Sequence, residues 1–399
     1  MLNDPVVIVS AARTPLGGFM GDLAPLTCAQ LGSVAIRAAI ERAGLKPEQV
    51  EEVIMGCVLS AGQGQAPARQ AALGAGLPLA TACTTVNKIC GSGMRAMMFA
   101  NDMLLAGSST VMVAGGMESM SNAPYLLPKA RGGYRMGHGS ILDHMTLDGL
   151  EDAYNRDERG GGRSMGTFGE DCAAKYEFTR AQQDAFAVAS VTRAQQATAD
   201  GSFAWEIVPV SVPSKTGEVT VDTDEGPRKI KIEKIPLLKP AFKKDGTVTA
   251  ASSSSINDGA AALVMMRQST ADKLGLKALA RVVGHSTHSQ EPGWFTTAPV
   301  GAITKLYAKT GWKTADVDLF EINEAFAVVP MAAMQEHGIP HEKINVHGGA
   351  CALGHPIGAS GARIVVTLIG ALRKHGGKRG VASLCIGGGE ATALAIELI

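Results

Sequence analysis

No apolar run in the 399-residue sequence approaches the ~20 residues needed to span a bilayer. A dominant sign of charge is also missing, since 37 lysines and arginines balance 37 aspartates and glutamates. A net charge of zero argues against general nucleic-acid binding and against attachment to an anionic membrane. Residues 1–10 carry Asp4 and no basic lead-in, so they predict a first strand rather than a signal peptide.

Cysteine motifs for disulfides and metals are absent as well. The seven cysteines are odd in number, scattered, and never spaced as CxxC, which argues against a disulfide framework and against a zinc site. Unpaired cysteines suit a reducing compartment, and the final Ile-Glu-Leu-Ile is no peroxisomal or retention signal. We therefore expect a cytoplasmic protein.

An internal repeat gives the chain its organisation. Residues 44–56 share their length and pattern with residues 311–323, at an offset of 267. Residues 92–95 resemble residues 360–363 at an offset of 268, and both copies continue as helix, glycine and strand. A nearly constant offset over several elements predicts two homologous βα-rich halves, a duplicated mixed-sheet α/β domain.

The region between the repeats differs from both halves and predicts an inserted loop or cap domain. It contains a glycine run at 160–162 and a helix over 179–200 that begins with a capping box. The predicted domains are 1–119 plus 257–278, then 120–256, then 279–399. The predicted elements of the two halves are a helix over 27–44, a turn at 11–15, and strands at 6–9, 50–55, 84–86, 110–114 and 381–384.

Cys90 is the first candidate nucleophile. It lies on a glycine-flanked turn between the extended run at 84–86 and a helix that ends at Gly107. The partial positive charge of a helix N-terminus favours a thiolate, and Gly91 and Gly93 allow a substrate carbonyl to approach. A buried structural cysteine is the alternative for this residue taken alone.

His355 provides the partner that a cysteine nucleophile needs. It stands just ahead of Ser360, the repeat equivalent of Ser92 beside Cys90, so pseudo-symmetry can bring the two turns together. An imidazole that accepts the thiol proton makes the sulfur reactive at neutral pH.

Two further positions follow buried strands in the second half. Cys385 ends the strand at 381–384 and precedes a glycine loop in which Gly387 offers an unobstructed N–H to an oxyanion. Asn323 stands at a strand end where the other copy has Gly56, which suggests an added function, although an Asx-turn also explains it.

Four motifs together carry a family resemblance over essentially the whole chain. They are Asn-Lys-Ile-Cys-Gly-Ser-Gly at 87–93, Asn-Glu-Ala-Phe-Ala at 323–327, Gly-His-Pro-Ile-Gly-Ala-Ser-Gly at 354–361 and Cys-Ile-Gly-Gly-Gly at 385–389. The sequence resembles the thiolase family, most closely its acetyl-CoA C-acetyltransferases. The resemblance implies a duplicated fold with two βαβαβαββ halves, a five-layered α-β-α-β-α core and an inserted loop domain.

The resemblance also implies roles for these residues in a reversible Claisen condensation of two acetyl-CoA molecules. Cys90 would be acetylated after activation by His355, and Cys385 would remove the α-proton of the second acetyl-CoA. Asn323, with a water and His355, would form one oxyanion hole. The backbone N–H groups of Cys90 and Gly387 would form the other, because the reaction develops charge on two different oxygens.

The implied contacts to coenzyme A are less regular. Ser254 matches the serine expected on the pantetheine arm, although Ser252 replaces a frequent asparagine, and Arg228 matches a basic residue near the adenosine. Met165 matches a methionine of the acyl pocket, but Ser164 stands where short-chain members usually carry histidine. Two phenylalanines are also expected near the substrate, with Phe295 as the pocket wall: Phe295 and Phe326.

Three other functions remain to be weighed against the short-chain enzyme. A degradative thiolase for longer 3-oxoacyl-CoA chains would share every catalytic residue. Ketosynthase-like condensing enzymes lack the acid/base that Cys385 would provide, and a non-enzymatic scaffold would have lost Cys90, His355 or Cys385. By resemblance we also expect acyl-CoA substrates, no metal or redox cofactor, and a homotetramer in which residues 120–143 tether two dimers.

Overall fold

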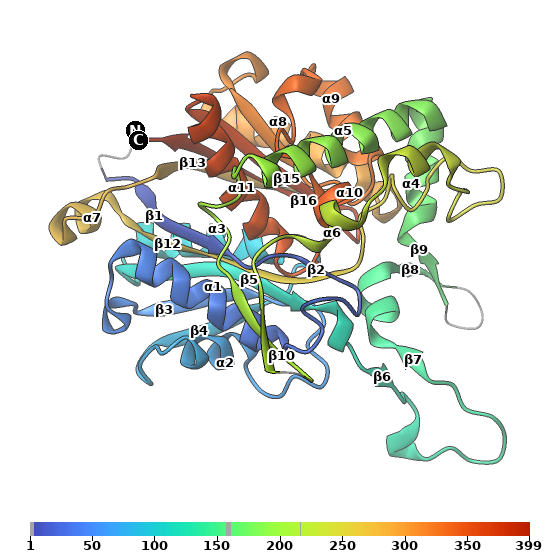
Figure 1. Ribbon diagram of the computed structural model, residues 1–399, viewed down its shortest axis with the longest axis horizontal. Helices are drawn as coiled ribbons and strands as arrows, with labels where there is room; N and C mark the ends of the chain where they lie inside the picture. The colour runs from blue at the N-terminus through green and yellow to red at the C-terminus, as the bar shows by residue number, and fades with distance from the viewer. Residues whose placement is uncertain (1–3, 157–160, 216) are drawn as a thin grey trace.

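The computed structural model of the chain describes residues 4–156, 161–215 and 217–399 (Figure 1). Gly160, the first residue of the predicted glycine run, lies outside this set. No helix in the described part is long and apolar enough to cross a membrane.

Nine strands form one long path of hydrogen-bonded neighbours with a repeated topology. In the first half β3 is parallel to β4 and β5, whereas β12 is antiparallel to β5 and β1. In the second half β14 is parallel to β15, and β16 is antiparallel to β15 and β13. The path is β14 (Leu319–Ile322), β15 (Arg379–Ile386), β16 (Glu390–Leu398), β13 (Ala280–Ser289), β1 (Val6–Arg13), β12 (Asn257–Arg267), β5 (Val111–Ser119), β3 (Glu52–Gly56) and β4 (Ala82–Val86).

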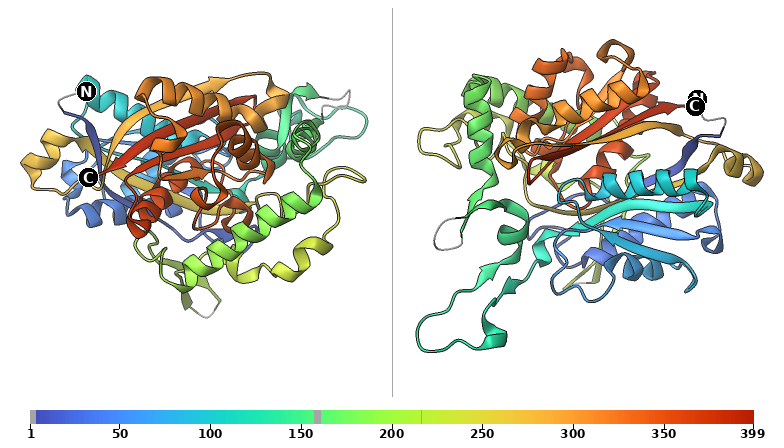
Figure 2. Two further views of the ribbon diagram at one scale, coloured as in Figure 1. Left: turned by 90° about the horizontal axis from the view of Figure 1, so that it is seen from above. Right: turned by 180° about the vertical axis from the view of Figure 1, so that it is seen from behind.

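Helices cover both halves of the sheet and separate them. Helices α1 and α2 pack on the outer face of the first half, α8 and α9 on the outer face of the second, and α3 and α11 lie between (Figures 1 and 2). Their bounds are α1 (Cys28–Ala43), α2 (Pro67–Gly74), α3 (Ser92–Ala106), α8 (Ala298–Thr310), α9 (Val328–His337) and α11 (Ser360–His375). The duplicated, five-layered α-β-α-β-α fold predicted from the sequence is confirmed.

The starts of two helices, predicted from their capping residues, agree with the structure. The Thr27 side chain accepts the N–H of Gln30 in a full capping box, and α1 stops at Gly44, which has the left-handed φ of 69°. Thr179 caps α5 (Arg180–Ala199) in the same way with Gln182. These local hydrogen bonds are independent of tertiary packing, which is why sequence alone finds them.

Three strand predictions were wrong in extent. Strand β1 continues through the predicted turn to Arg13, and β5 continues through Gly115 and Gly116 to Ser119. Glycine there marks close packing rather than a chain reversal, because a Cβ on Gly115 would lie 2.1 Å from the Ala261 carbonyl oxygen. Cys385 ends no final strand either, since β15 reaches Ile386 and β16 follows it.

The chain leaves the first half of the sheet after β5 and re-enters it at β12. The intervening elements are β6 (Tyr125–Leu126), β7 (Leu142–Asp143), β8 (Glu151–Arg156), β9 (Gly162–Ser164), α4 (Met165–Lys175), α5, β10 (Val210–Ser214), β11 (Gly217–Val221) and α6 (Glu225–Lys229). Strands β6 and β7 with their connecting loop extend away from the body (Figure 2). The exposed large apolar side chains of this arm are Tyr125, Leu127, Tyr134, Met136 and Ile141.

Candidate active site

The N-termini of α3 and α11 meet in the middle layer of the fold. A Cβ on Gly361 would lie 2.4 Å from the backbone nitrogen of Met94, and one on Gly93 would lie 2.8 Å from that of Ala362. The repeated Ser-Gly pair therefore allows the two helix ends to touch. This contact joins the turn that carries Cys90 to the loop that carries His355 and Ile357, and Ile357 belongs to the apolar cluster against which Cys90 packs.

Cys90 lies on the turn between β4 and α3, where Gly387 of the β15–β16 turn donates its backbone N–H to the sulfur. Burial raises the pKa of the Cys90 thiol to about 11; the N–H groups of Gly387 and Cys90 oppose this increase and the charge of Glu118 adds to it. The helix N-terminus therefore does not by itself produce a thiolate, contrary to the expectation from sequence. A base must remove the proton.

His355 is held as a neutral base. Ser360 donates its only hydroxyl proton to the Pro356 carbonyl at 2.9 Å, so the 2.6 Å contact with His355 requires Nδ1 of the imidazole to be the donor. The other ring nitrogen, Nε2, is then unprotonated and lies 3.5 Å from Nδ2 of Asn323. Burial, followed by the positive charge of Arg363, lowers the pKa of His355 to about 3, so the ring is uncharged at neutral pH.

Replacing Ser360 with alanine is expected to lower kcat roughly tenfold with little change in KM, because loss of a ~1.5 kcal/mol hydrogen bond releases the tautomer that keeps Nε2 free. Steady-state kinetics across a pH series would show this as a reduced plateau and a displaced acidic limb. Ser286→Ala is the matched control, since Ser286 is also buried and donates to the Ala302 carbonyl at 2.6 Å, away from the site. An equal loss in both variants would contradict the positioning role.

Cys385 and Asn323 complete the polar group at this end of the second half-sheet. Cys385 is fully buried in β15, and burial, followed by the charge of Cys90, raises the pKa of its thiol well above the usual range. Asn323 follows β14, and its Oδ1 is buried without a hydrogen-bond partner among the described residues. An acceptor left in this state is suited to a bound water or a substrate group.

Glu118 is a residue whose role the sequence did not reveal. Its carboxylate accepts three backbone N–H groups, from Val58 at 3.0 Å, Leu59 at 3.1 Å and Gly358 at 2.9 Å. It thereby fixes two loops beside Cys90, and burial raises its pKa to about 7 against these hydrogen bonds. The only signal was its place at the end of the repeated Gly-Gly-x-Glu pattern, which Glu390 ends in the other copy.

A cavity of about 410 Å³ adjoins the β15–β16 turn, and its lining includes Ile89, Met165, Tyr154 and Gly387. Ser164 is the exposed N-cap residue of α4. The two expected phenylalanines line neither this cavity nor the larger one described below. Phe295 packs edge-to-face on Phe168, and Phe326 on Phe242, inside the apolar cluster that contains Cys385.

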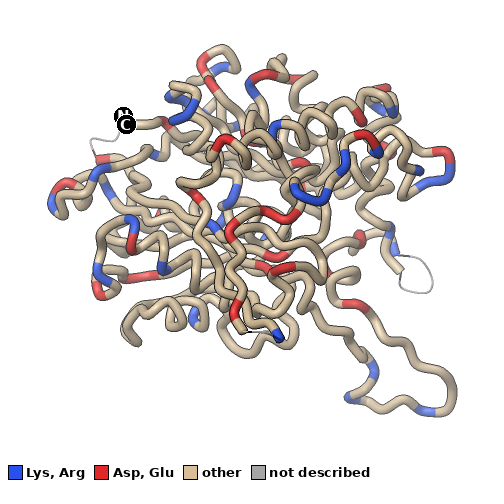
Figure 3. The backbone as a smooth tube through the Cα atoms, in the orientation of Figure 1, with Lys and Arg blue, Asp and Glu red and all other residues tan. Residues whose placement is uncertain are grey.

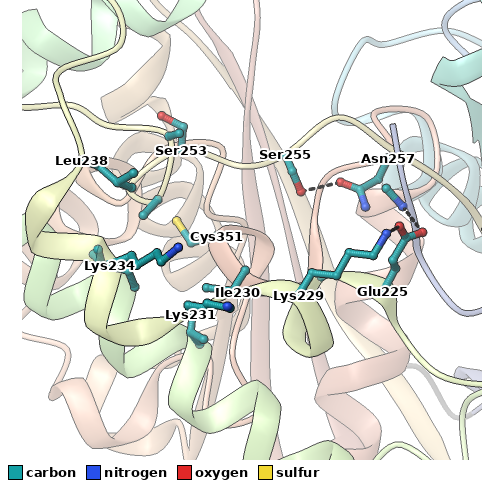
Figure 4. Close-up of a pocket in the computed structure, with 16 residues that line it drawn as sticks. Glu225, Lys229, Ile230, Lys231, Lys234, Leu238, Ser253, Ser255, Asn257 and Cys351 are labelled. Carbon is teal, nitrogen blue, oxygen red and sulfur yellow. Dashed lines mark hydrogen bonds and ion pairs between the residues drawn. The ribbon is translucent and has the colours of Figure 1, made fainter. Parts of the chain in front are cut away.

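A second cavity, of about 510 Å³, separates the loop segment at 229–238 from the segment at 250–257 (Figure 4). Lysines lie on one wall, and Ser253, Ser255 and Asn257 lie on the other. Elsewhere positive and negative residues are interspersed along the visible chain (Figure 3). The lysines of this wall are Lys229, Lys231 and Lys234.

Two residues predicted to contact the coenzyme, Ser254 and Arg228, do not line this cavity. The two neighbours of Ser254 do line it, and the N–H of Ser254 donates to the Ala325 carbonyl at 3.0 Å. Arg228 is paired with Asp22 and lines a separate cavity beside the β10–β11 hairpin.

Comparison with known proteins gives consistent matches over the full length. Residues 6–269 match the N-terminal domain of thiolase, and residues 276–398 match the C-terminal domain. The chain is 52% identical to acetyl-CoA acetyltransferase 2 of Arabidopsis thaliana, over 99% of this chain and 97% of that protein. It is 49% identical to acetyl-CoA acetyltransferase of Cupriavidus necator, over 98% and 99%. The crystal structure of Acat5 thiolase from Ascaris suum in complex with coenzyme A superimposes with a TM-score of 0.92 at 41% identity, covering 99% of this chain and 100% of that one.

Proposed function

The chain belongs to the thiolase family, and from this premise we propose how its residues act on their substrates. It is an acetyl-CoA C-acetyltransferase that joins two acetyl-CoA molecules into acetoacetyl-CoA and CoA, reversibly. Both substrates are acyl-CoA thioesters. The proposal for the residues rests above all on one feature: a thiol that receives the Gly387 N–H stands beside a loop whose histidine is held neutral.

In the first half-reaction, Nε2 of His355 takes the proton of Cys90, and the thiolate attacks the acetyl carbonyl carbon. Charge that develops on the carbonyl oxygen is stabilised by the N–H groups of Cys90 and Gly387, a pair worth several kcal/mol in a dry site. The C–S bond to CoA then breaks, and His355 returns the proton to the leaving thiolate. Cys90 is left acetylated.

In the second half-reaction, Nε2 of His355 takes the proton of the Cys385 thiol, and the Cys385 thiolate removes an α-proton from a new acetyl-CoA. The enolate oxygen is held by His355 Nε2–H and by Asn323 through a water, which its unpartnered Oδ1 is placed to bind. The enolate carbon attacks the acetyl carbonyl, and the bond from carbon to Cys90 sulfur breaks. Acetoacetyl-CoA leaves, the proton on Nε2 of His355 passes to the Cys90 thiolate, and Cys385 keeps the proton that it took from acetyl-CoA.

The CoA moiety is assigned to the 510 Å³ cavity. Its apolar floor suits the pantetheine arm, with Ser253 and Ser255 as hydrogen-bond partners, and its lysines suit phosphate groups. Arg228 would reach the nucleotide end only after its ion pair with Asp22 opens. No metal or redox cofactor is needed, because thiols and an imidazole carry every step.

We further propose a cytoplasmic homotetramer that acts in fatty acid metabolism. All seven cysteines are free thiols, which suits a reducing compartment. The apolar side chains of the projecting arm at 125–141 are exposed, and a second dimer would cover them. Strand β4 lies at the edge of the sheet, where a partner subunit can extend it.

Acetoacetyl-CoA is expected to be cleaved with a kcat/KM at least ~10-fold above that of 3-oxohexanoyl-, 3-oxooctanoyl- or 3-oxodecanoyl-CoA, since each added methylene must fit beside Met165 and Tyr154. Tyr154 closes the acyl side, as its hydroxyl would lie 3.2 Å from a Cβ placed on Gly388. Steady-state thiolysis with CoA across the four substrates measures this. A rate that holds or rises with chain length would instead support a degradative thiolase.

A further inference from the structure

Three side chains outside the proposed mechanism converge beneath α1. Cys28 is the first residue of α1, Cys57 follows β3, and Glu118 lies in β5. The two sulfur atoms are 3.7 Å apart, and Sγ of Cys57 is 3.8 Å from Oε1 of Glu118. One potential ligand atom from each residue lies within 4.8 Å of the other two, and all three residues are buried.

These distances fit a metal ion better than a covalent bond between the cysteines. Two thiolates at ~2.3 Å from one tetrahedral zinc ion stand about 3.8 Å apart, and a carboxylate oxygen at ~2.0 Å stands about 3.5 Å from each sulfur. A disulfide would require ~2.05 Å between the sulfurs, and both cysteines are free thiols.

The surroundings leave the cluster without a cation but with room for one. None of its three side chains forms an ion pair with a lysine or arginine in the described ranges. A cavity of about 290 Å³ is lined by Cys28 and Gln63 and provides space for a water ligand. The Gln63 amide lies 3.5 Å from the Cys57 sulfur, and its Oε1 is buried without a hydrogen-bond partner among the described residues.

We propose that Cys28, Cys57 and Glu118 bind a thiophilic divalent metal ion of the zinc class, with the adjacent cavity supplying the fourth ligand. Thiolates together with one carboxylate form a donor set that zinc accepts in proteins. The ligands are 29 and 61 positions apart in the chain, so no CxxC pattern announces them. The sequence-based argument against a zinc site, which rested on that spacing, does not apply to this site.

A metal ion bound at this site would affect the active site through Glu118. The same carboxylate holds the N–H groups of Val58, Leu59 and Gly358, and Gly358 follows His355 by three positions. A metal ion that draws Oε1 away loosens the Leu59 hydrogen bond and shifts the loop that carries His355. The bound ion therefore lowers the rate of thiolysis.

The binding test uses the full-length chain with Cys90→Ala, which removes the proposed nucleophilic thiol without affecting the cluster. Titration with Co²⁺ under a non-thiol reductant is expected to give one ion per chain and a thiolate-to-cobalt charge-transfer band, which Zn²⁺ displaces. Adding Cys28→Ala, or Cys28→Ser if the alanine variant folds poorly, should abolish the band. Adding Cys83→Ala, a thiol outside the cluster, should leave it unchanged.

Absence of the band in the parent, or its persistence after the Cys28 substitution, would overturn the site. This result does not depend on the proposed function, because no turnover is measured. In the chain with Cys90 intact, preincubation with Zn²⁺ and removal of free metal should lower the thiolysis rate at least ~10-fold more than in Cys28→Ala, whose basal rate stays normal. Equal inhibition in both would overturn the link through Glu118.

Discussion

Cys90→Ala is expected to reduce both thiolysis of acetoacetyl-CoA and condensation of acetyl-CoA by at least ~10⁴-fold. No other described thiol can replace this sulfur, because it alone receives the Gly387 N–H at the junction of the two half-repeats. Without this nucleophile no acetyl-enzyme forms, so neither half-reaction can proceed even though the oxyanion donors and His355 remain in place. Stability should change little, since the residue keeps partial exposure and alanine preserves the backbone.

Intact-protein mass spectrometry after incubation with acetyl-CoA separates loss of chemistry from loss of binding. The unaltered chain should gain one acetyl group, whereas Cys90→Ala should gain none. CoA should still raise the melting temperature of Cys90→Ala, which would show that binding is intact. Cys83→Ala, which removes a half-exposed thiol elsewhere, should be acetylated normally. An acetyl adduct on Cys90→Ala would place the nucleophile at another residue.

The meeting of the two turns that carry Cys90 and His355 was predictable because short contiguous motifs and an internal repeat both pointed to it. Ser92 and Ser360 share a position in the two copies, and the glycine after each permits the helix ends to meet, so a symmetry argument led to the neighbourhood of Cys90 and His355. What the sequence could not provide was the balance between burial and the helix N-terminus. That balance leaves Cys90 as a thiol and makes the neutral state of His355 necessary.

Features that depend on distant backbone escaped the sequence. Gly115 and Gly116 were interpreted as a strand end, yet they lie inside β5, because β12 and the Gly358 loop pass too close for side chains. Glu118 acts through three N–H groups from two other segments, which no local pattern encodes. The Cys28–Cys57 pair is hidden for the same reason.

Cys385→Ala is expected to slow the second half-reaction much more than the first. Acetylation of Cys90 by acetyl-CoA needs His355 and the Gly387 N–H but no α-proton transfer, so exchange of label between CoA and acetyl-CoA should retain a substantial rate. Condensation and thiolysis both need a group that takes or gives the α-proton, and each should fall by ~10²- to 10⁴-fold, the usual contribution of a positioned acid or base. A purely structural role for Cys385 would lower exchange and condensation together.

The ratio of the label-exchange rate to the condensation rate in Cys385→Ala is therefore the decisive quantity, and the position of Cys385 explains why the two rates should differ. Cys385 is fully buried beside Cys90, and the charge of one thiolate raises the pKa of the other, so the two sulfurs are not both ionised at neutral pH. The thiolate that Cys90 forms when His355 takes its proton opposes ionisation of Cys385, whereas acetylated Cys90 carries no charge, so Cys385 is expected to ionise only after the first half-reaction is complete. Cys385 thus becomes a base at the stage at which the second acetyl-CoA must lose its α-proton.

Pre-acetylated enzyme should accordingly exchange the α-protons of added acetyl-CoA analogues with solvent faster than free enzyme does, and Cys385→Ala should show no exchange in either state. Equal exchange by free and acetylated enzyme would contradict this ordering of the two thiols.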